Sequence, residues 1–233
     1  MKLGVVAALS QELGPTLGAI ATTPRVLEGL RFRESPSLVF VAGGVGSRPA
    51  AAASLLLADH FKPDALLSVG FCGALGEDLA TADLLLGGTT QHPPDASLLA
   101  LARSAATGAR SGLVLTVPRV VVDAAEKQEL ARKTGALVID MEADAVAVAA
   151  KARGLGFLAV KAVIDTPGAP LASTYAGCWT VLKDLFKGSV MGMVYDAKRV
   201  KLASERLREF FLALRDRLAA SGPPGGARGS GAD

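Results

Sequence analysis

Two acidic residues in the second half of the chain each close a largely apolar segment. Glu142 follows residues 136–141, and Asp165 follows residues 159–164. Such β-branched runs are typical of buried strands, and an open α/β sheet binds its ligands at the carboxyl ends of its strands. Residues 143–153 between them predict a helix, which gives one β-α-β unit. We therefore expect Glu142 and Asp165 to lie within a substrate's width of each other, as a two-carboxylate site.

A structural interpretation of the same two acids stays open from the residues alone. Glu142 would then begin a helix, where a carboxylate complements the positive end of the helix dipole. Asp165 would be a turn residue before Thr166 and Pro167. Short acidic motifs of this kind occur often by chance, so further matches are needed to separate the two interpretations.

A third acid, Glu12, follows a buried strand predicted over residues 3–9. Ser10 is a candidate N-cap for the helix or turn that begins there, and a glutamate in a first helical turn is favourable for the dipole alone. Its place at the carboxyl end of a strand is also the place expected of a site residue.

A glycine turn around Gly44 joins a strand over residues 38–42 to a helix over residues 47–60. A dinucleotide-binding fingerprint fails here, because Pro49 stands at its third glycine. The next strand, 65–69, also ends without the acid that would hold a ribose. What remains is a tight turn whose backbone comes close to a ligand.

A second glycine turn, Gly70-Phe71-Cys72-Gly73, follows the strand over residues 65–69. A thiol nucleophile at Cys72 would need a histidine to activate it, and no histidine stands in a suitable motif. We therefore interpret Cys72 as a small buried thiol in a tight loop.

Size and composition favour one soluble α/β domain. The chain has 233 residues, of which 50% are hydrophobic, enough for a large core. Its apolar runs are shorter than the roughly 18 residues that a membrane span needs. The apolar start is too short for a signal peptide, so we expect a cytoplasmic protein.

The remaining counts argue against metal and nucleic-acid chemistry. Two cysteines and two histidines form neither a disulfide framework nor a metal-ligand cluster, and we expect no metal and no cofactor. The net charge of +3 is modest and its basic excess lies largely between residues 183 and 217. We infer no nucleic-acid partner.

Several motifs together resemble the nucleoside phosphorylase and nucleosidase superfamily. They are Asp140-Met-Glu142 with the alanine-rich run after it, Lys161-Ala-Val-Ile-Asp165, Lys62-Pro-Asp64 and the glycine turn 70–73. The resemblance is greatest to the 5'-methylthioadenosine/S-adenosylhomocysteine nucleosidase branch. It implies a three-layer α/β/α domain with a mixed, largely parallel, twisted central sheet, a homodimer, and a nucleoside as the small-molecule partner.

The resemblance also implies roles for particular residues. Glu12 would activate the attacking water, Met141 and Glu142 would hold the ribose, and Asp165 would protonate the purine. Val121 belongs to a segment that would form the wall over the base. The remaining residues expected around the substrate are Gly44, Gly70, Phe71, Cys72 and Gly73.

The chain departs from that branch in five places. Phe71 and Ile164 stand where the family usually has serine, and Ala82 replaces a glycine. The segment 87–110, which shapes the thioalkyl pocket in the branch, is shortened. The run from about residue 173 to 218 is longer than the single closing helix of the branch. The last two features resemble the hopanoid-biosynthesis branch, which removes adenine from adenosylhopane.

The function expected from these matches is hydrolysis of the N-glycosidic bond of an adenine-containing nucleoside, with adenosylhopane as the alternative substrate. A phosphorylase is disfavoured, because those relatives carry a Gly-Asp-Pro-x-Arg run that is absent after the first strand. A non-catalytic binding or storage protein of the same fold is a further alternative, against which the retention of Glu12, Glu142 and Asp165 argues.

The carboxyl-terminal part is expected to extend this one domain, which would span residues 1–220, with 221–233 as a flexible tail. From about residue 173 it is basic and apolar, and it predicts two or three helical pieces that cover the sheet. Peripheral membrane contact through the same helices is the alternative.

Overall fold

The computed structural model describes residues 1–168 and 197–220, and the description below concerns these residues. The expectations for Cys178, for the apolar and basic residues of 173–196, and for the flexible tail 221–233 lie outside them. Within the described part there are nine strands and six helices. In chain order they are β1 (Leu3–Ala7), α1 (Ser10–Ala19), β2 (Thr23–Leu27), β3 (Leu30–Glu34), β4 (Leu38–Ala42), α2 (Ser47–Phe61), β5 (Ala65–Ala74), β6 (Leu84–Thr89), α3 (Ala96–Ala105), β7 (Arg110–Thr116), α4 (Ala124–Thr134), β8 (Val138–Asp140), α5 (Ala143–Ala152), β9 (Gly156–Asp165) and α7 (Ala197–Ala220).

All nine strands belong to one mixed sheet, in the order β2-β3-β4-β1-β5-β8-β7-β6-β9. Parallel pairing joins β4 to β1, β1 to β5, β5 to β9, β6 to β7 and β7 to β8. Since β9 also pairs with β5, the second half of the sheet closes on itself. The strands β5, β8, β7, β6 and β9 thus form a small barrel, and the first half extends from it as an open sheet.

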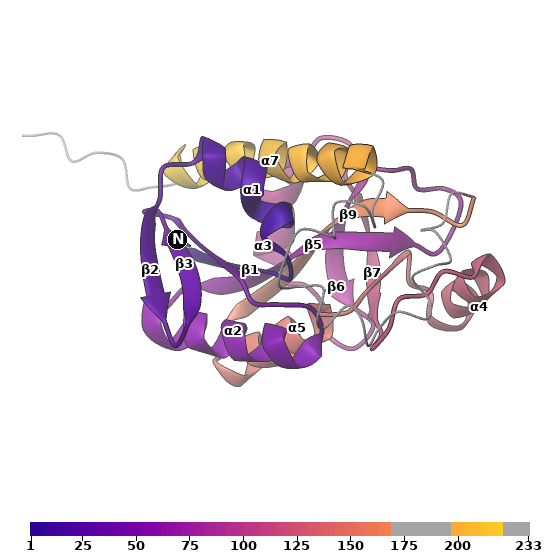
Figure 1. Cartoon of the computed structure of the whole chain (residues 1–233), viewed down its shortest axis with the longest axis horizontal. Coiled ribbons are helices and arrows are strands. Elements are labelled where there is room, and N and C mark those ends of the chain that lie inside the picture. Colours follow the sequence, from indigo (N-terminus) through magenta and orange to yellow (C-terminus); the bar gives the residue numbers. More distant parts are fainter. Residues whose placement is uncertain (169–196, 221–233) are drawn as a thin grey trace, which may run out of the picture.

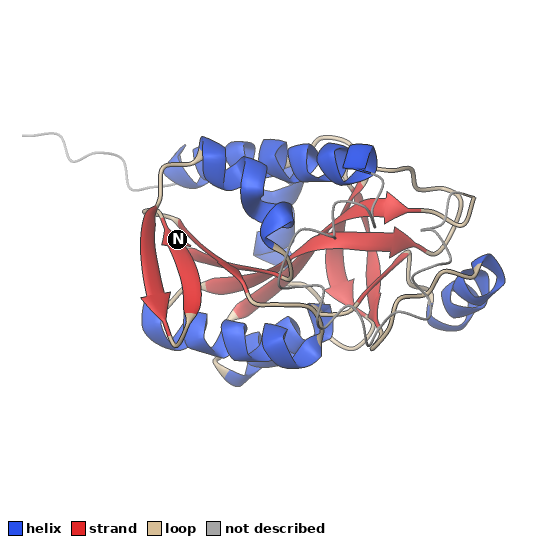
Figure 2. Cartoon of the chain, viewed as in Figure 1, coloured by secondary structure: helices blue, strands red, loops and turns tan. Residues whose placement is uncertain are grey.

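Helices cover both faces of the sheet, and the layers are seen from the side in Figure 1 and Figure 2. Helices α1, α3 and α7 lie on one face, and α2 and α5 lie on the other. Their apolar side chains pack with the strands into two extensive core clusters. The expected single α/β/α domain with a mixed, twisted sheet is confirmed.

Helix α7 is a cover on the sheet in the part that the structure describes. Ala203, Leu207, Phe210, Phe211 and Leu214 are buried on one side of it. The Phe211 ring packs against Phe40 of β4 with 5.3 Å between the ring centroids. Residues 197–220 form one continuous helix. No helix among residues 1–168 and 197–220 is both long and apolar enough to cross a membrane.

The strands that carry the two expected acids are not neighbours, which corrects the simple β-α-β prediction. β8 and β9 lie on opposite sides of β5: β9 runs parallel to it, and β8 pairs antiparallel to it at only two residues. Gly73 of β5 is paired with Ile139 on one side and with Asp165 on the other. Because β8 is antiparallel to β5, the chain that follows β8 runs back along β5. Glu142 therefore comes to lie near the same part of β5 as Asp165.

Ala82 adopts a left-handed backbone conformation at the position where related sequences have glycine. Its φ is +70°, and its N–H donates to the carbonyl of Val163 (2.8 Å), so the turn is tied to β9. An L-residue with a side chain is strained in this region, whereas glycine is not. The substitution to alanine therefore stores strain in the loop before β6.

We predict that Ala82→Gly stabilises the protein by about 0.5–1 kcal/mol, because relief of strain exceeds the added freedom of the unfolded chain. Denaturant unfolding would measure the change. Gly135→Ala is the matched control. Its φ is +69° with nothing near the added methyl group, so it should destabilise by roughly 1 kcal/mol. If Ala82→Gly is no more stable than wild type, the backbone of Ala82 is not strained.

Candidate active site

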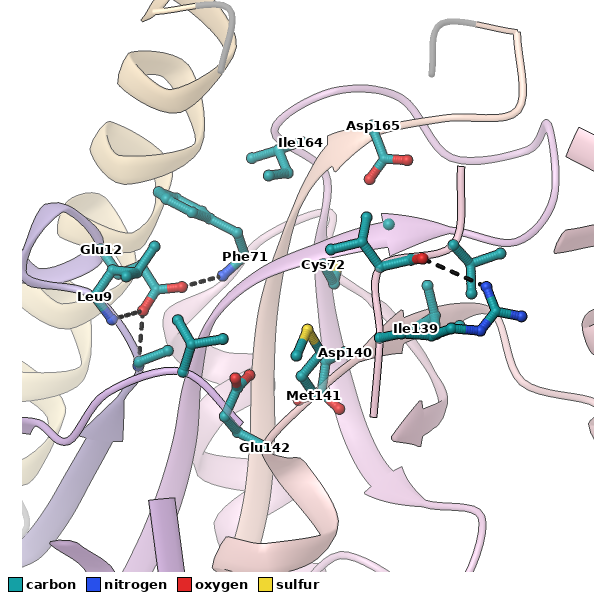
Figure 3. Close-up of a pocket in the computed structure, with 16 residues that line it drawn as sticks. Leu9, Glu12, Phe71, Cys72, Ile139, Asp140, Met141, Glu142, Ile164 and Asp165 are labelled. Carbon is teal, nitrogen blue, oxygen red and sulfur yellow. Dashed lines mark hydrogen bonds between the residues drawn. The ribbon is translucent and has the colours of Figure 1, made fainter. Parts of the chain in front are cut away.

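A pocket opens beside the carboxyl-terminal half of β5, and the residues that line it are drawn in Figure 3. Its empty volume is about 620 Å³, including space continuous with solvent. The three acids expected from the sequence lie around it, with Glu12, Glu142 and Asp165 on three sides. The lining residues are Ala8, Leu9, Glu12, Val45, Phe71, Cys72, Gly73, Arg119, Val120, Val121, Ile139, Asp140, Met141, Glu142, Ile164 and Asp165.

Glu12 is held at the start of α1 by backbone donors from two elements. The N–H groups of Ala8 and Leu9 donate to its Oε2 (2.9 and 2.7 Å), and the N–H of Phe71 in β5 donates to Oε1 (2.8 Å). Leu9, rather than Ser10, is the N-cap residue of this helix. Burial raises the pKa of Glu12 to about 7, against the opposing effect of these donors and of Lys161.

Gly70 provides the space that Glu12 occupies. A Cβ at this residue would lie 2.4 Å from Oε1 of Glu12, and its φ of +145° also favours glycine. Gly70 is not itself part of the pocket lining. Its predicted importance at the site is therefore explained by the carboxyl group that packs against it.

Glu142 faces the pocket from the start of α5. The N–H of Gly46 in the first glycine turn donates to its Oε1 (2.7 Å), which links the turn before α2 to the site. Burial raises the pKa of Glu142, and the nearby Lys161 partly offsets this rise. Gly44 does not line the pocket; its neighbour Val45 does.

A buried ion pair lies close to these carboxyl groups. Nζ of Lys161 in β9 is 2.7 Å from Oδ2 of Asp140 and donates to the hydroxyl of Ser68 (3.0 Å). Thr116 donates to the other carboxyl oxygen of Asp140 (2.7 Å). Burial alone would lower the pKa of Lys161, but the charges of Asp140, Glu142 and Glu12 raise it above its ordinary value.

Asp165 reaches the pocket because of a bulge at the end of β9. Consecutive residues of a regular strand point to opposite faces, yet Ile164 and Asp165 both line the pocket. The register explains this: Cys72 pairs with Val163 and Gly73 pairs with Asp165, so Ile164 is an extra residue on β9. A Cβ on Gly73 would lie 2.7 Å from Oδ1 of Asp165, so here too glycine leaves room for a carboxyl group.

Asp165 is ion-paired with Lys127 of α4. Nζ of Lys127 donates to Oδ2 of Asp165, and the lysine side chain is fully buried. Burial raises the pKa of Asp165, and the lysine charge and hydrogen bond partly offset the rise. No local pattern indicates this contact, because α4 is otherwise a polar helix in which a lysine is expected to face solvent.

Sequence comparison places the chain in a known group. A profile of the phosphorylase superfamily matches residues 2–92 and 86–177. The chain belongs to this superfamily. A 5'-methylthioadenosine/S-adenosylhomocysteine nucleosidase of Shewanella piezotolerans is 22% identical over 198 residues, which cover 71% of this chain and 86% of that protein.

Two solved structures from Helicobacter pylori share the superfamily fold with this chain, each with a TM-score of 0.74. One is a methylthioadenosine nucleosidase variant with 5'-methylthioadenosine in its active site, 17% identical over 92% of this chain and 98% of the other. The second is a futalosine hydrolase, 18% identical over 93% of this chain and 97% of the other.

The structure brings together most of the residues singled out from the sequence. Eight of the ten line the pocket: Glu12, Phe71, Cys72, Gly73, Val121, Met141, Glu142 and Asp165. Cys72 is buried and its pKa is well above the ordinary value, as expected of an inert thiol. No group of three or more potential metal ligands occurs in residues 1–168 and 197–220.

Several residues around the pocket were not singled out from the sequence. Arg119 and Val120 lie within the segment 118–122 that was expected to form the wall over the base, although only Val121 was named from it. Asp140 and Lys161 lie within motifs that were noted for Glu142 and Asp165. A lysine in the middle of an apolar strand was the available signal for Lys161, since such a residue needs a buried partner. A signal of that kind is absent for Lys127.

The raised pKa of Glu12 gives a testable dependence of stability on pH. The pKa of Glu12 in the folded state lies above its ordinary value of 4.5. The stability that Glu12 contributes is therefore fully present below pH 4.5 and is lost as the pH rises through about 7. Relative to wild type, Glu12→Gln should therefore gain up to about 3 kcal/mol of stability between pH 4 and 8.

Denaturant unfolding of wild type and Glu12→Gln between pH 4 and 8 measures this change in relative stability. The substitution also alters hydrogen bonds, but that effect is constant with pH and cancels when the two ends of the range are compared. Glu34→Gln is the control of opposite sign, because a hydrogen bond from Lys2 lowers the pKa of Glu34. That variant should lose stability relative to wild type as the pH rises. If the difference in the free energy of unfolding between wild type and Glu12→Gln does not change with pH, the pKa of Glu12 is not raised.

Proposed function

We propose that this protein is a nucleosidase that hydrolyses the N-glycosidic bond of an adenine-containing nucleoside, with water as the nucleophile. The observation that carries the proposal is the arrangement of three carboxyl groups around one pocket, the buried Glu12 and Asp165 and the partly buried Glu142, in a phosphorylase-superfamily fold. Cleavage of this bond needs a base for water, support for a positively charged sugar, and an acid for the departing purine. Each carboxyl group is suited to one of these tasks.

Glu12 is suited to activate water. A general base is most effective when its pKa lies near the working pH, and burial raises the pKa of Glu12 to about 7. Its carboxyl group is fixed by three backbone N–H donors, so its orientation does not depend on mobile side chains. In the proposed step, water adds to the sugar carbon and loses a proton to Glu12.

Glu142 is suited to hold the ribose, with Met141 beside it against the sugar. One oxygen of Glu142 accepts from Gly46 and the group lines the pocket, so sugar hydroxyls can donate to it. These hydrogen bonds would strengthen as positive charge develops on the sugar, which favours the transition state over the bound substrate.

Asp165 is suited to protonate the base. Burial raises its pKa, which favours the protonated form needed in a general acid. As the bond to the sugar breaks, its electrons pass to the purine ring and a ring nitrogen takes the proton of Asp165. The purine then leaves as a neutral molecule.

The spacing along β5 fits this division of tasks. Glu12 packs against Gly70 and Asp165 packs against Gly73, so the two carboxyl groups reach the pocket from different points along β5. A sugar ring can lie between the two carboxyl groups, with water on one face and the departing base on the other.

Base release tests the proposal directly. The protein would be incubated with methylthioadenosine, S-adenosylhomocysteine, adenosine and inosine, with and without phosphate, and the free base followed by chromatography. We expect phosphate-independent release of adenine from the first two. Release that requires phosphate would identify a phosphorylase. No release from any of the four would contradict the proposed substrate and leave adenosylhopane or a non-catalytic role.

Substitution of the acid and the base separates their roles. Asp165→Asn keeps the shape but removes the transferable proton, so turnover should fall by about 10²-fold or more, with a smaller change in KM. Glu12→Gln should lower turnover similarly. Asp59→Asn and Glu34→Gln are matched controls, because both lie outside the pocket. Wild-type rates in both site variants would show that the roles are wrongly assigned.

A further inference from the structure

Lys127 is the one buried side chain of α4 in the described structure, and nothing in the preceding proposal uses it. The helix is otherwise polar, with its other charged residues at the surface. Asp123 caps its first turn by accepting from the N–H of Glu126 (2.7 Å), and Gly135 ends it in a left-handed conformation. A fully buried lysine is costly unless it is paired, and its partner here is Oδ2 of Asp165.

The residue before Asp165 gives it no side-chain hydrogen bond. It is Ile164, whose side chain has no donor. The hydrogen bond to the Asp165 side chain comes instead from α4, a different element of the fold. Oδ1 of Asp165 accepts no hydrogen bond from residues 1–168 or 197–220.

We propose that Lys127 is the positioning residue for Asp165: it fixes the carboxyl group over Gly73 and stabilises the carboxylate that forms when the proton passes to the departing base. This inference rests on the proposed function, since it assigns a role within that reaction. Lys127 is not part of the pocket lining, so it acts through Asp165 and not on the substrate.

The charges around Asp165 explain why a cation is needed beside it. When Asp165 gives its proton to the purine, a negative charge appears in a buried place, where it is unfavourable without a partner. The ammonium group of Lys127 is already in hydrogen-bond contact with the other carboxyl oxygen. It therefore makes Asp165 a stronger acid than burial alone would leave it, and the carboxylate needs no rearrangement of water when it forms.

Among residues 1–168 and 197–220, no other charged side chain is in hydrogen-bond contact with Asp165. Arg199 of α7 lowers the pKa of Asp165 through its charge, and the Cys72 thiol of β5 is held neutral by its own raised pKa. Arg119 lines the same pocket but is ion-paired with Glu126. Since Lys127 is the cation in contact, its removal should have a larger effect on the pKa of Asp165 than removal of either arginine.

The test compares Lys127→Met and Lys127→Arg with wild type in kcat and in the pH dependence of kcat/KM. The limb of the profile that belongs to Asp165 is identified as the one that Asp165→Asn abolishes. Loss of the cation raises the pKa of Asp165, so Lys127→Met should move this limb to higher pH and lower kcat by about 10-fold or more, with less change in KM. Lys127→Arg should leave the limb in place.

Lys127→Gln is a second variant that keeps a donor but not the charge, and it should also move the limb to higher pH. Lys133→Met removes an exposed lysine from the same helix and is the control that should change neither quantity. A limb that stays at its wild-type pH in the folded Lys127→Met and Lys127→Gln proteins would overturn the proposal. A purely structural lysine would lower stability without moving the limb.

A measurement that needs no substrate keeps this inference separate from the proposed function. A double-mutant cycle with Lys127→Met, Asp165→Asn and the double variant gives the coupling of the two groups in the free energy of unfolding. If wild type releases no base from any nucleoside, the proposed function fails, while the cycle still decides whether the pair is coupled. If the effects of the two substitutions on the free energy of unfolding are additive, Lys127 and Asp165 are not coupled.

Discussion

The absence of side chains at Gly70 and Gly73 is the constraint on which the site depends. Each glycine of β5 lies directly under a carboxyl group, so a methyl group at either place would displace Glu12 or Asp165. The strand between them sets the distance across the pocket, and its pairing with β8 and β9 fixes the two walls. The geometry of the site is therefore a property of one strand and its register, rather than of the loops around it.

Charge balance is the second condition for this arrangement. Glu12, Asp140, Glu142 and Asp165 are gathered around one pocket, and burial raises the pKa of Glu12, Glu142 and Asp165. Lys161 and Lys127 limit this effect in different ways. Lys161 pairs with Asp140 and acts on Glu12 and Glu142 through space, whereas Lys127 contacts Asp165 alone. Each of the two lysines thereby lowers the pKa of the acids near it and opposes the effect of burial.

Much of the fold could be predicted from local patterns, since buried strands and alanine-rich helices are strongly encoded by apolar residues. The hairpin of β2 and β3 was missed, because an exposed edge strand such as Thr23–Leu27 lacks an apolar alternation. The acids were found because they end strands. The bulge at Ile164 and the burial of Lys127 could not be found, because both depend on register and packing between distant segments, which no local pattern records.

Closure of the sheet into a barrel affects how the molecule reaches its native state. Glu12 follows the first strand, whereas Asp165 ends the last, and β9 inserts between β5 and β6 to complete the ring. Contacts between residues so distant in sequence form slowly, because a long loop must close before they give any stabilisation. The pocket is therefore assembled late in folding, and a partly folded chain with β9 unpaired has two open strand edges and an incomplete site.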